Sequence, residues 1–190
     1  MSTEETKRFE STEQIVESLR QRRDLSGADL SGLDLSGMKL TGLTMEGADL
    51  SDTNLRKAVL AAGSMAAVNL SGAQLNEALV VAADMKGANL RGANLTATRI
   101  NAVNLENADL TEADLTGAKW FAVNVTGADF SGVKTTGAQA AGVNWSGAKV
   151  PPAEIPAPPP VPPWLPALLA GIGVLLVMAI IFGRKRHRAR

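Results

Sequence analysis

The feature that most limits how this chain can fold is a repeat of five residues. From Leu25 to Val150, every fifth residue is apolar except Thr135, and the register is unbroken over 26 positions. The residue two places before each of these centres is usually small, most often Ala, and Gly follows the centre by two places in 14 repeats. Asp or Asn commonly precedes the centre, and Ser or Thr commonly follows it. This period matches neither the 3.6 residues of an α-helix nor the two of a simple strand.

A period of five residues is satisfied when each unit makes a short extended edge followed by a turn. Four such edges form a square coil of twenty residues, in which the centre and the small residue point inward and the other three point outward. Gly suits the corner, where a type II turn requires a positive φ, and Asp, Asn, Ser and Thr can bond the local backbone. Coils stacked about 4.8 Å apart predict an all-β rod of roughly six coils, about 30 Å tall.

The composition predicts an interior filled by stacked small and aliphatic side chains. Aromatic residues make up only 4% of the 190 residues, and Tyr is absent. Trp120 is large for an inward position, but the residue stacked on it one coil later would be Ala140. We interpret this pair as volume compensation inside the coil.

Individual repeat units resemble those of the pentapeptide-repeat family, which read Ala, Asp or Asn, Leu and two variable residues. Examples are Ala28-Asp29-Leu30-Ser31-Gly32 and Ala113-Asp114-Leu115-Thr116-Gly117. The resemblance covers residues 24–150 and implies a right-handed quadrilateral β-helix, in agreement with the geometric reasoning.

The N-terminal segment, residues 1–23, has no apolar run typical of a signal peptide. Ser11-Thr12-Glu13-Gln14 fits a capping box that opens a helix near residues 12–22. Ile15, Val16 and Leu19 would give this helix one apolar stripe, suited to covering the first coil, because open coil ends expose strand edges. The alternative is an N-terminal helix that does not pack on the coil.

The segment after the repeats, residues 151–163, contains eight prolines and is predicted to be a semi-rigid polyproline II spacer. Its P-x-x-P match, Pro156 to Pro159, is also compatible with a ligand for an aromatic groove. The spacer interpretation is favoured.

Residues 164–182 contain no charged residue and are predicted to form a single transmembrane helix. Nineteen helical residues reach about 28 Å, close to the thickness of the hydrocarbon core. Residues 183–190 form a basic tail. The predicted anchor and its flanks comprise Trp164, Leu165, Phe182, Arg184, Lys185 and Arg186.

The orientation of this predicted single-pass protein is open to two interpretations. The basic tail favours a cytoplasmic C-terminus, which would require export of the repeat domain. We favour instead a tail-anchored protein whose β-helix stays in the cytoplasm, because export of a large domain without a visible signal is the harder step.

Residues 24–150 offer little that supports catalysis. They contain many carboxylates but no His, Cys or Tyr to act with them, so neither a nucleophile–base pair nor a metal-ligand cluster can be assembled. We therefore expect no enzymatic activity, no cofactor and no metal.

One predicted outer face of the coil differs from the other three. Its outward positions combine apolar and basic residues and lack carboxylates, whereas the opposite face is acidic. A cluster of exposed apolar residues indicates an interaction site, although tolerated surface substitutions, or cover by the N-terminal segment, would also account for it. The candidate interaction face comprises Lys39, Val59, Leu79, Val81, Arg99, Lys119 and Phe121.

The leading functional hypothesis is a membrane-anchored scaffold or adaptor that presents this face to a protein partner, to a second copy of the chain or to an anionic membrane surface. The family resemblance implies an alternative, because some pentapeptide-repeat proteins mimic duplex DNA and bind type II topoisomerases. Here, however, residues 24–150 carry only 13 Asp/Glu against 9 Lys/Arg, and nucleic acid itself is not an expected partner. An exported or translocated effector is a third hypothesis.

Overall fold

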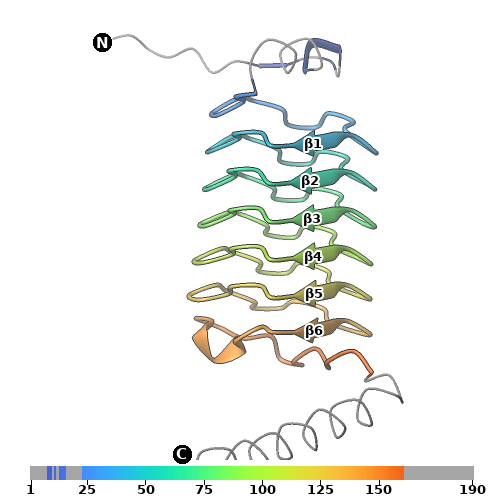
Figure 1. The fold of residues 1–190 in the computed structure, drawn as a ribbon, viewed down its shortest axis with the longest axis vertical. Helices are drawn as coiled ribbons and strands as arrows, with labels where there is room; N and C mark the ends of the chain where they lie inside the picture. Colours follow the sequence, from blue (N-terminus) through green and yellow to red (C-terminus); the bar gives the residue numbers. More distant parts are fainter. Residues whose placement is uncertain (1–7, 10, 12, 16–22, 161–190) are drawn as a thin grey trace, which may run out of the picture. The chain divides into compact units, whose positions relative to one another are not determined.

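The computed structural model describes residues 8–9, 11, 13–15 and 23–160. The chain divides into two compact units, residues 1–158 and 159–190. The first unit is a stack of coils (Figure 1). One side of the stack is a six-stranded sheet whose strands follow each other in chain order: β1 (Lys39–Thr41), β2 (Val59–Ala61), β3 (Leu79–Val81), β4 (Arg99–Asn101), β5 (Lys119–Phe121) and β6 (Gln139–Ala141).

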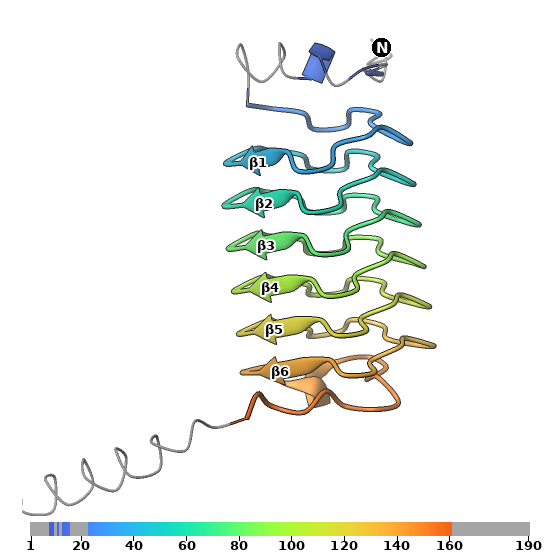
Figure 2. The same cartoon turned by 90° about the vertical axis from the view of Figure 1, so that its right-hand side faces the viewer.

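The twenty-residue coil is confirmed by the register of the sheet. All five strand pairings are parallel and join residues twenty apart, as Leu40 does with Leu60. The other three sides are joined by isolated parallel bridges at the same interval, such as Asp29 with Asp49, and Asp34 with Asn54. Figure 2 shows the regular stack of coils after a 90° turn, with β1 to β6 along one side.

The predicted division into inward and outward positions is also confirmed. The repeat centres and the small residues two places earlier form one continuous buried core. Two of the small positions hold Thr, and both side chains are fully buried. Their hydroxyls are satisfied locally, because Thr53 donates to the Leu50 carbonyl and Thr98 to the Leu95 carbonyl, each at 2.7 Å. The core therefore accepts a polar residue where a turn carbonyl lies within reach.

The corners require a left-handed backbone whichever residue occupies them. Thirteen glycines have a positive φ, as predicted, but so do eleven other residues, among them Ala62 and Glu77. Each coil must turn four times to remain in register with its neighbours. The stack therefore imposes at the corners a conformation that these side chains alone disfavour.

The N-terminal end of the stack is covered as predicted where the structure describes it. Gln14 N lies 3.4 Å from Ser11 Oγ, in agreement with Ser11 as the helix cap, and residues 13–15 are helical. Ile15 is fully buried, and Phe9, which was not predicted to take part, is buried beside the first coil with its amide bonded to Asp29 O. Val16, Leu19 and the rest of the predicted helix lie outside the described residues.

The C-terminal boundary of the β-helix differs from the prediction, because the first residues of the expected spacer close the stack. Ala140 N donates to Ala157 O and Thr135 Oγ1 to Glu154 O, both at 2.9 Å, and Pro152 and Pro156 are buried. The proline-rich chain can do this because the last coil supplies donors and needs only carbonyl acceptors, which proline does not remove. Pro156, the first proline of the P-x-x-P match, is therefore packed within this cap.

Aromatic side chains fill the interior near the same end. Trp120 stacks on Trp145 of the 3-10 helix η1 (Trp145–Gly147) with ring centroids 6.0 Å apart, and Phe130 meets Trp145 edge-on at 5.3 Å. Trp120 is paired with Ala140, as the volume argument predicted.

The predicted transmembrane segment, residues 164–182, lies outside the described residues, as do the basic tail and the end of the proline-rich segment. Within the part of the chain that the structure describes, no helix is long and apolar enough to span a bilayer.

Candidate interaction face

The outward side chains of β1 to β6 form a distinct side of the stack, which we call the strand face. All seven residues predicted for the candidate interaction face lie on it. Each strand contributes the residue before its buried centre and the residue after it, so the face consists of two parallel columns. These columns are Lys39, Val59, Leu79, Arg99, Lys119 and Gln139, and Thr41, Ala61, Val81, Asn101, Phe121 and Ala141.

The apolar part of the strand face is less exposed than the sequence predicted, with one exception. Phe121 is 60% exposed, whereas Val59, Leu79 and Val81 are half-buried. Val59 and Leu79 are direct partners in the sheet register and cover part of each other. Phe121 lies between Asn101 and Ala141 in its column and has no large neighbour there to cover it.

The basic residues of the strand face differ from those on the other sides because they form no ion pairs with the described carboxylates. Residues 24–150 contain nine Lys and Arg residues. Six of them pair with carboxylates on the other three sides: Arg56 and Lys57 with Glu77, Lys86 with Glu106, Arg91 with Glu112, Lys134 with Asp114, and Lys149 with Asp129. Among the described residues, the remaining three, Lys39, Arg99 and Lys119, have no carboxylate within ion-pair distance.

All three unpaired cations therefore lie on the strand face, which carries no Asp or Glu. Exposed ion pairs add little stability, but they do neutralise charge locally. The Arg56 hydrogen bond lowers the pKa of Glu77, and the Glu106 hydrogen bond raises the pKa of Lys86. Every pair joins residues 20 or 21 apart, so this pattern is readable from the sequence once the coil length is known.

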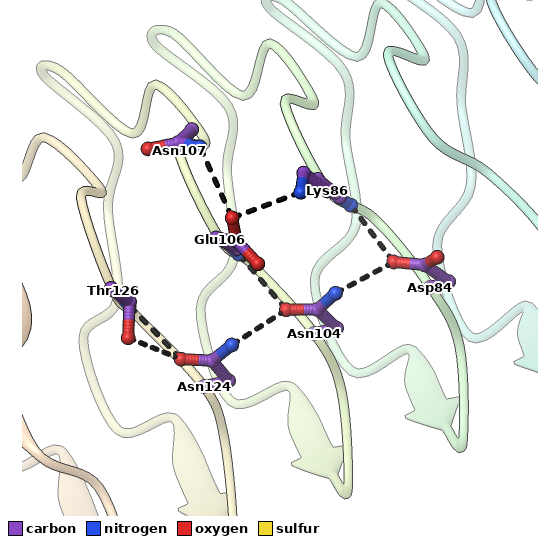
Figure 3. A network of polar contacts seen from close by, with 7 residues as sticks. All are labelled: Asp84, Lys86, Asn104, Glu106, Asn107, Asn124 and Thr126. Atoms are coloured by element: carbon purple, nitrogen blue, oxygen red, sulfur yellow. Dashed lines mark hydrogen bonds and ion pairs between the residues drawn. The ribbon is translucent and has the colours of Figure 1, made fainter.

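On the other sides of the stack, polar side chains bond mainly to one another and to nearby backbone amides. Figure 3 shows one ladder, in which Asn124 Nδ2 donates to Asn104 Oδ1 and Asn104 Nδ2 to Asp84 Oδ1, each at 2.9 Å. The same Asn104 oxygen also accepts the amide of Glu106 at 3.2 Å. A second ladder joins Asn89, Asn69 and Asp49. Polar groups on these sides are thus engaged in holding the coils together.

Several site predictions are left untested or incomplete. The predicted anchor residues Trp164, Leu165, Phe182, Arg184, Lys185 and Arg186 lie outside the described residues. Ile155, in the cap, is 60% exposed and was not predicted as part of any site. Within the described ranges, no group of three or more His, Cys, Asp or Glu side chains could hold a metal ion.

Comparison with protein families gives a match over the repeats. The profile described as "Pentapeptide repeats" matches in eight copies, over residues 24–56, 69–107, 88–119 and 99–137, which together exceed half of the chain. No curated protein matches the chain.

Comparison with solved structures also gives matches. Trypsin-treated QnrB1, described as a plasmid-mediated fluoroquinolone resistance protein, is 22% identical with a TM-score of 0.59, and the match covers 65% of this chain and 65% of QnrB1. This chain thus spans less than two thirds of the length of QnrB1. A pentapeptide repeat protein of the Arabidopsis thaliana thylakoid lumen is 31% identical over 57% of this chain and 66% of its own, with a TM-score of 0.28. The likeness to QnrB1 shows a shared fold.

Proposed function

Because this chain belongs to the pentapeptide-repeat family, we propose that it is a non-enzymatic scaffold, tethered to a membrane, whose strand face is its interaction surface. One observation carries this proposal. The strand face combines the three unpaired cations of the β-helix with the exposed Phe121 ring, while the other sides are engaged in ion pairs and amide ladders. Free charge beside exposed apolar surface is typical of a binding site.

A binding role also suits the chemistry of the β-helix. Asp29, Asp34 and Asp129 each accept a hydrogen bond at 3.0 Å from the backbone amide two residues later. These carboxylates therefore hold turns, and a partner for general acid–base work is absent from residues 24–150, which contain no His, Cys or Tyr. The stacked coils supply a rigid platform.

The membrane tether rests on the sequence of residues 164–182, which is uncharged and apolar throughout. We propose the tail-anchored orientation, with the β-helix in the cytoplasm. Protease treatment of intact cells or spheroplasts tests it, because a cytoplasmic β-helix is protected until the membrane is opened. Cleavage of the β-helix in intact cells would establish the opposite orientation.

Cysteine labelling tests the scaffold proposal directly, because the chain contains no Cys. Asn101→Cys places a thiol on the strand face between Val81 and Phe121, and Ser71→Cys places the matched control on the opposite side of the coil. In membranes from expressing cells, we expect a maleimide to label the control, and to label the strand-face thiol at least fivefold more slowly until detergent is added.

Two results would contradict the proposal. Equal labelling of the two thiols in native membranes would show that nothing occupies the strand face. Recovery of the full-length chain in the aqueous fraction after lysis would show that it has no membrane tether.

The topoisomerase-binding alternative comes from the resemblance to the pentapeptide-repeat family. We expect it to fail here, because DNA mimicry requires a strongly negative rod, and the strand face is basic. Gyrase supercoiling should be unchanged by the purified chain. Inhibition or drug protection at stoichiometric amounts would favour this alternative instead.

A further inference from the structure

We propose that the strand face binds the surface of an anionic lipid bilayer, so that the β-helix lies against the membrane that holds it. This inference rests on the proposed function and names the partner of the same surface. Three independent features carry it: the charge of the face, its exposed ring and the place where the chain leaves the β-helix.

The charge of the strand face matches an anionic headgroup layer. Lys39, Arg99 and Lys119 are exposed and lie on β1, β4 and β5, so the cations are distributed along most of the sheet. With strands about 4.8 Å apart, Lys39 and Lys119 are separated by roughly 19 Å along the stack. A broad surface with uniform charge suits this spread better than a single bound anion does. Each cation near such a surface favours binding independently.

The exposed aromatic ring of the strand face suits the interfacial region of a bilayer. Phe121 is 60% exposed beside Lys119, which belongs to the same strand. Aromatic rings favour the boundary between headgroups and acyl chains. The corner residues that follow β2 to β5 are small and exposed, so they leave that edge of the face open to a flat surface: Ala62, Ala82, Ala102 and Ala122. At the opposite edge, the exposed corner residues Lys57 and Glu77 are ion-paired with each other.

The chain leaves the last coil of the β-helix beside the strand face. Ala157 bridges to Gln139 and accepts a hydrogen bond from Ala140, so the chain runs beside β6 when it leaves the last coil. Only six residues, 158–163, separate this point from the apolar segment. Fully extended, they reach at most about 22 Å. The proline-rich cap thus shortens the predicted spacer, and this length limits the distance between β6 and the start of the proposed anchor.

A second copy of the chain fits the strand face less well. Two strand faces in contact would bring together three unpaired cations from each copy, with no carboxylate on either face to offset them. Like charges placed together in an interface oppose association. An acidic protein would satisfy the cations, and the experiment below distinguishes it from lipid.

The test uses the full-length chain reconstituted in nanodiscs, with an environment-sensitive fluorophore at Asn101→Cys or at the Ser71→Cys control. Discs contain phosphatidylcholine alone or with phosphatidylserine, and a lipid-borne quencher reports contact. We expect strong quenching at residue 101 in the anionic discs only, and none at residue 71. Protein partners are absent from this system, so quenching identifies lipid as the occupant.

A charge-matched pair of variants isolates the unpaired cations. Replacing Lys39, Arg99 and Lys119 by Gln should lower the equilibrium constant for binding of the face to the bilayer about 100-fold, since each cation contributes roughly a fivefold factor. Replacing the ion-paired Lys86, Lys134 and Lys149 by Gln changes the net charge equally and should leave quenching unchanged.

Each other outcome overturns the inference in a recognisable way. If the chain inserts into discs but the fluorophore at residue 101 is not quenched, the chain has a membrane tether but its strand face does not bind lipid. Equal quenching in both kinds of disc contradicts the role of charge. An emission shift at residue 101 that appears only when cell extract is added, without quenching by the lipid, assigns the face to a protein. A chain that does not enter discs refutes the tether, and with it the proposed function.

Discussion

The backbone conformation of the corner residues is the most repeated local constraint in the molecule. Eleven residues other than Gly adopt a positive φ, including Ala97 at 55° and Ala102 at 53°. For an L-residue this conformation costs roughly 1–2 kcal/mol. The hydrogen bonds between coils must offset that cost, because the amide of each of these eleven residues bonds to the next coil along the chain, as Ala97 N does with Thr116 O at 2.9 Å.

A substitution at a corner without nearby atoms measures the cost of the left-handed backbone conformation without a contribution from steric clashes. Gly87 has a φ of 66°, and a methyl group added there would meet no atom within 4 Å. We expect Gly87→Ala to lower the free energy of unfolding by about 1 kcal/mol through backbone strain alone. Chemical denaturation monitored by circular dichroism would measure it.

The reverse substitution at an equivalent corner is the control. Ala97→Gly should not destabilise the β-helix and is expected to raise the free energy of unfolding by up to about 0.5 kcal/mol, because relief of strain exceeds the added entropy of the unfolded chain. A loss of stability at Ala97→Gly, or no change at Gly87→Ala, would contradict a strained corner.

At the scale of elements, the last coil depends on matched side-chain volumes. Trp120 on β5 lies directly against Ala140 on β6, and both are buried. Trp145 and Phe130 occupy the remaining space around the Trp120 ring. The end of the core is therefore filled by three aromatic rings, and the small side chain of Ala140 makes room for one of them.

Enlarging that small side chain should loosen the end of the stack. We expect Ala140→Leu to cost about 1–3 kcal/mol through overpacking and to lower the melting temperature. Ala141→Leu, at the next position but pointing outward on the strand face, is the matched control and should leave the melting temperature nearly unchanged. Equal melting temperatures for the two variants would mean that Ala140 is not confined by Trp120.

At the scale of the whole molecule, the acidic turns predict a dependence of stability on pH. Hydrogen bonds from the Ser31 side chain and backbone lower the pKa of Asp29, those from Ser131 do the same for Asp129, and the pKa of Asp34 is lowered chiefly by the Ser36 backbone amide. The unfolded chain, with carboxyl pKa values near 3.8, therefore binds more protons than the folded chain as the pH falls. Stability from these groups is complete well above pH 3.8 and is lost as the pH falls through the lower folded-state values.

Denaturation at pH 7, 5 and 3 measures this effect. We expect the unfolding midpoint to be similar at pH 7 and 5 and clearly lower at pH 3. A variant with Asp29, Asp34 and Asp129 replaced by Asn, which can still accept the turn hydrogen bond, should lose less stability between pH 5 and 3 than the parent chain does. An identical loss in both proteins would assign the acid sensitivity to other groups.

The sequence was sufficient for the coil, its inward positions and the location of the strand face. A five-residue period maintained from Leu25 to Val150 leaves one regular geometry that buries every centre, and this geometry then determines which residues stack. The pairing of Trp120 with Ala140 and the clustering of Lys119 with Phe121 both follow from counting. These predictions needed no knowledge of tertiary contacts, because each repeat contacts mainly its neighbours in the stack.

Only the tertiary structure decided how the C-terminal end of the stack is closed. Composition alone indicates a spacer after residue 150, because proline has no backbone N–H to donate. The last coil, however, needs only hydrogen-bond acceptors, and the carbonyl oxygens of Glu154 and Ala157 supply them. Arg91 and Arg99 both point outward, but only Arg91 meets a carboxylate in the next coil, that of Glu112. A local pattern determines which way a side chain points, but what it meets there depends on residues about twenty positions away.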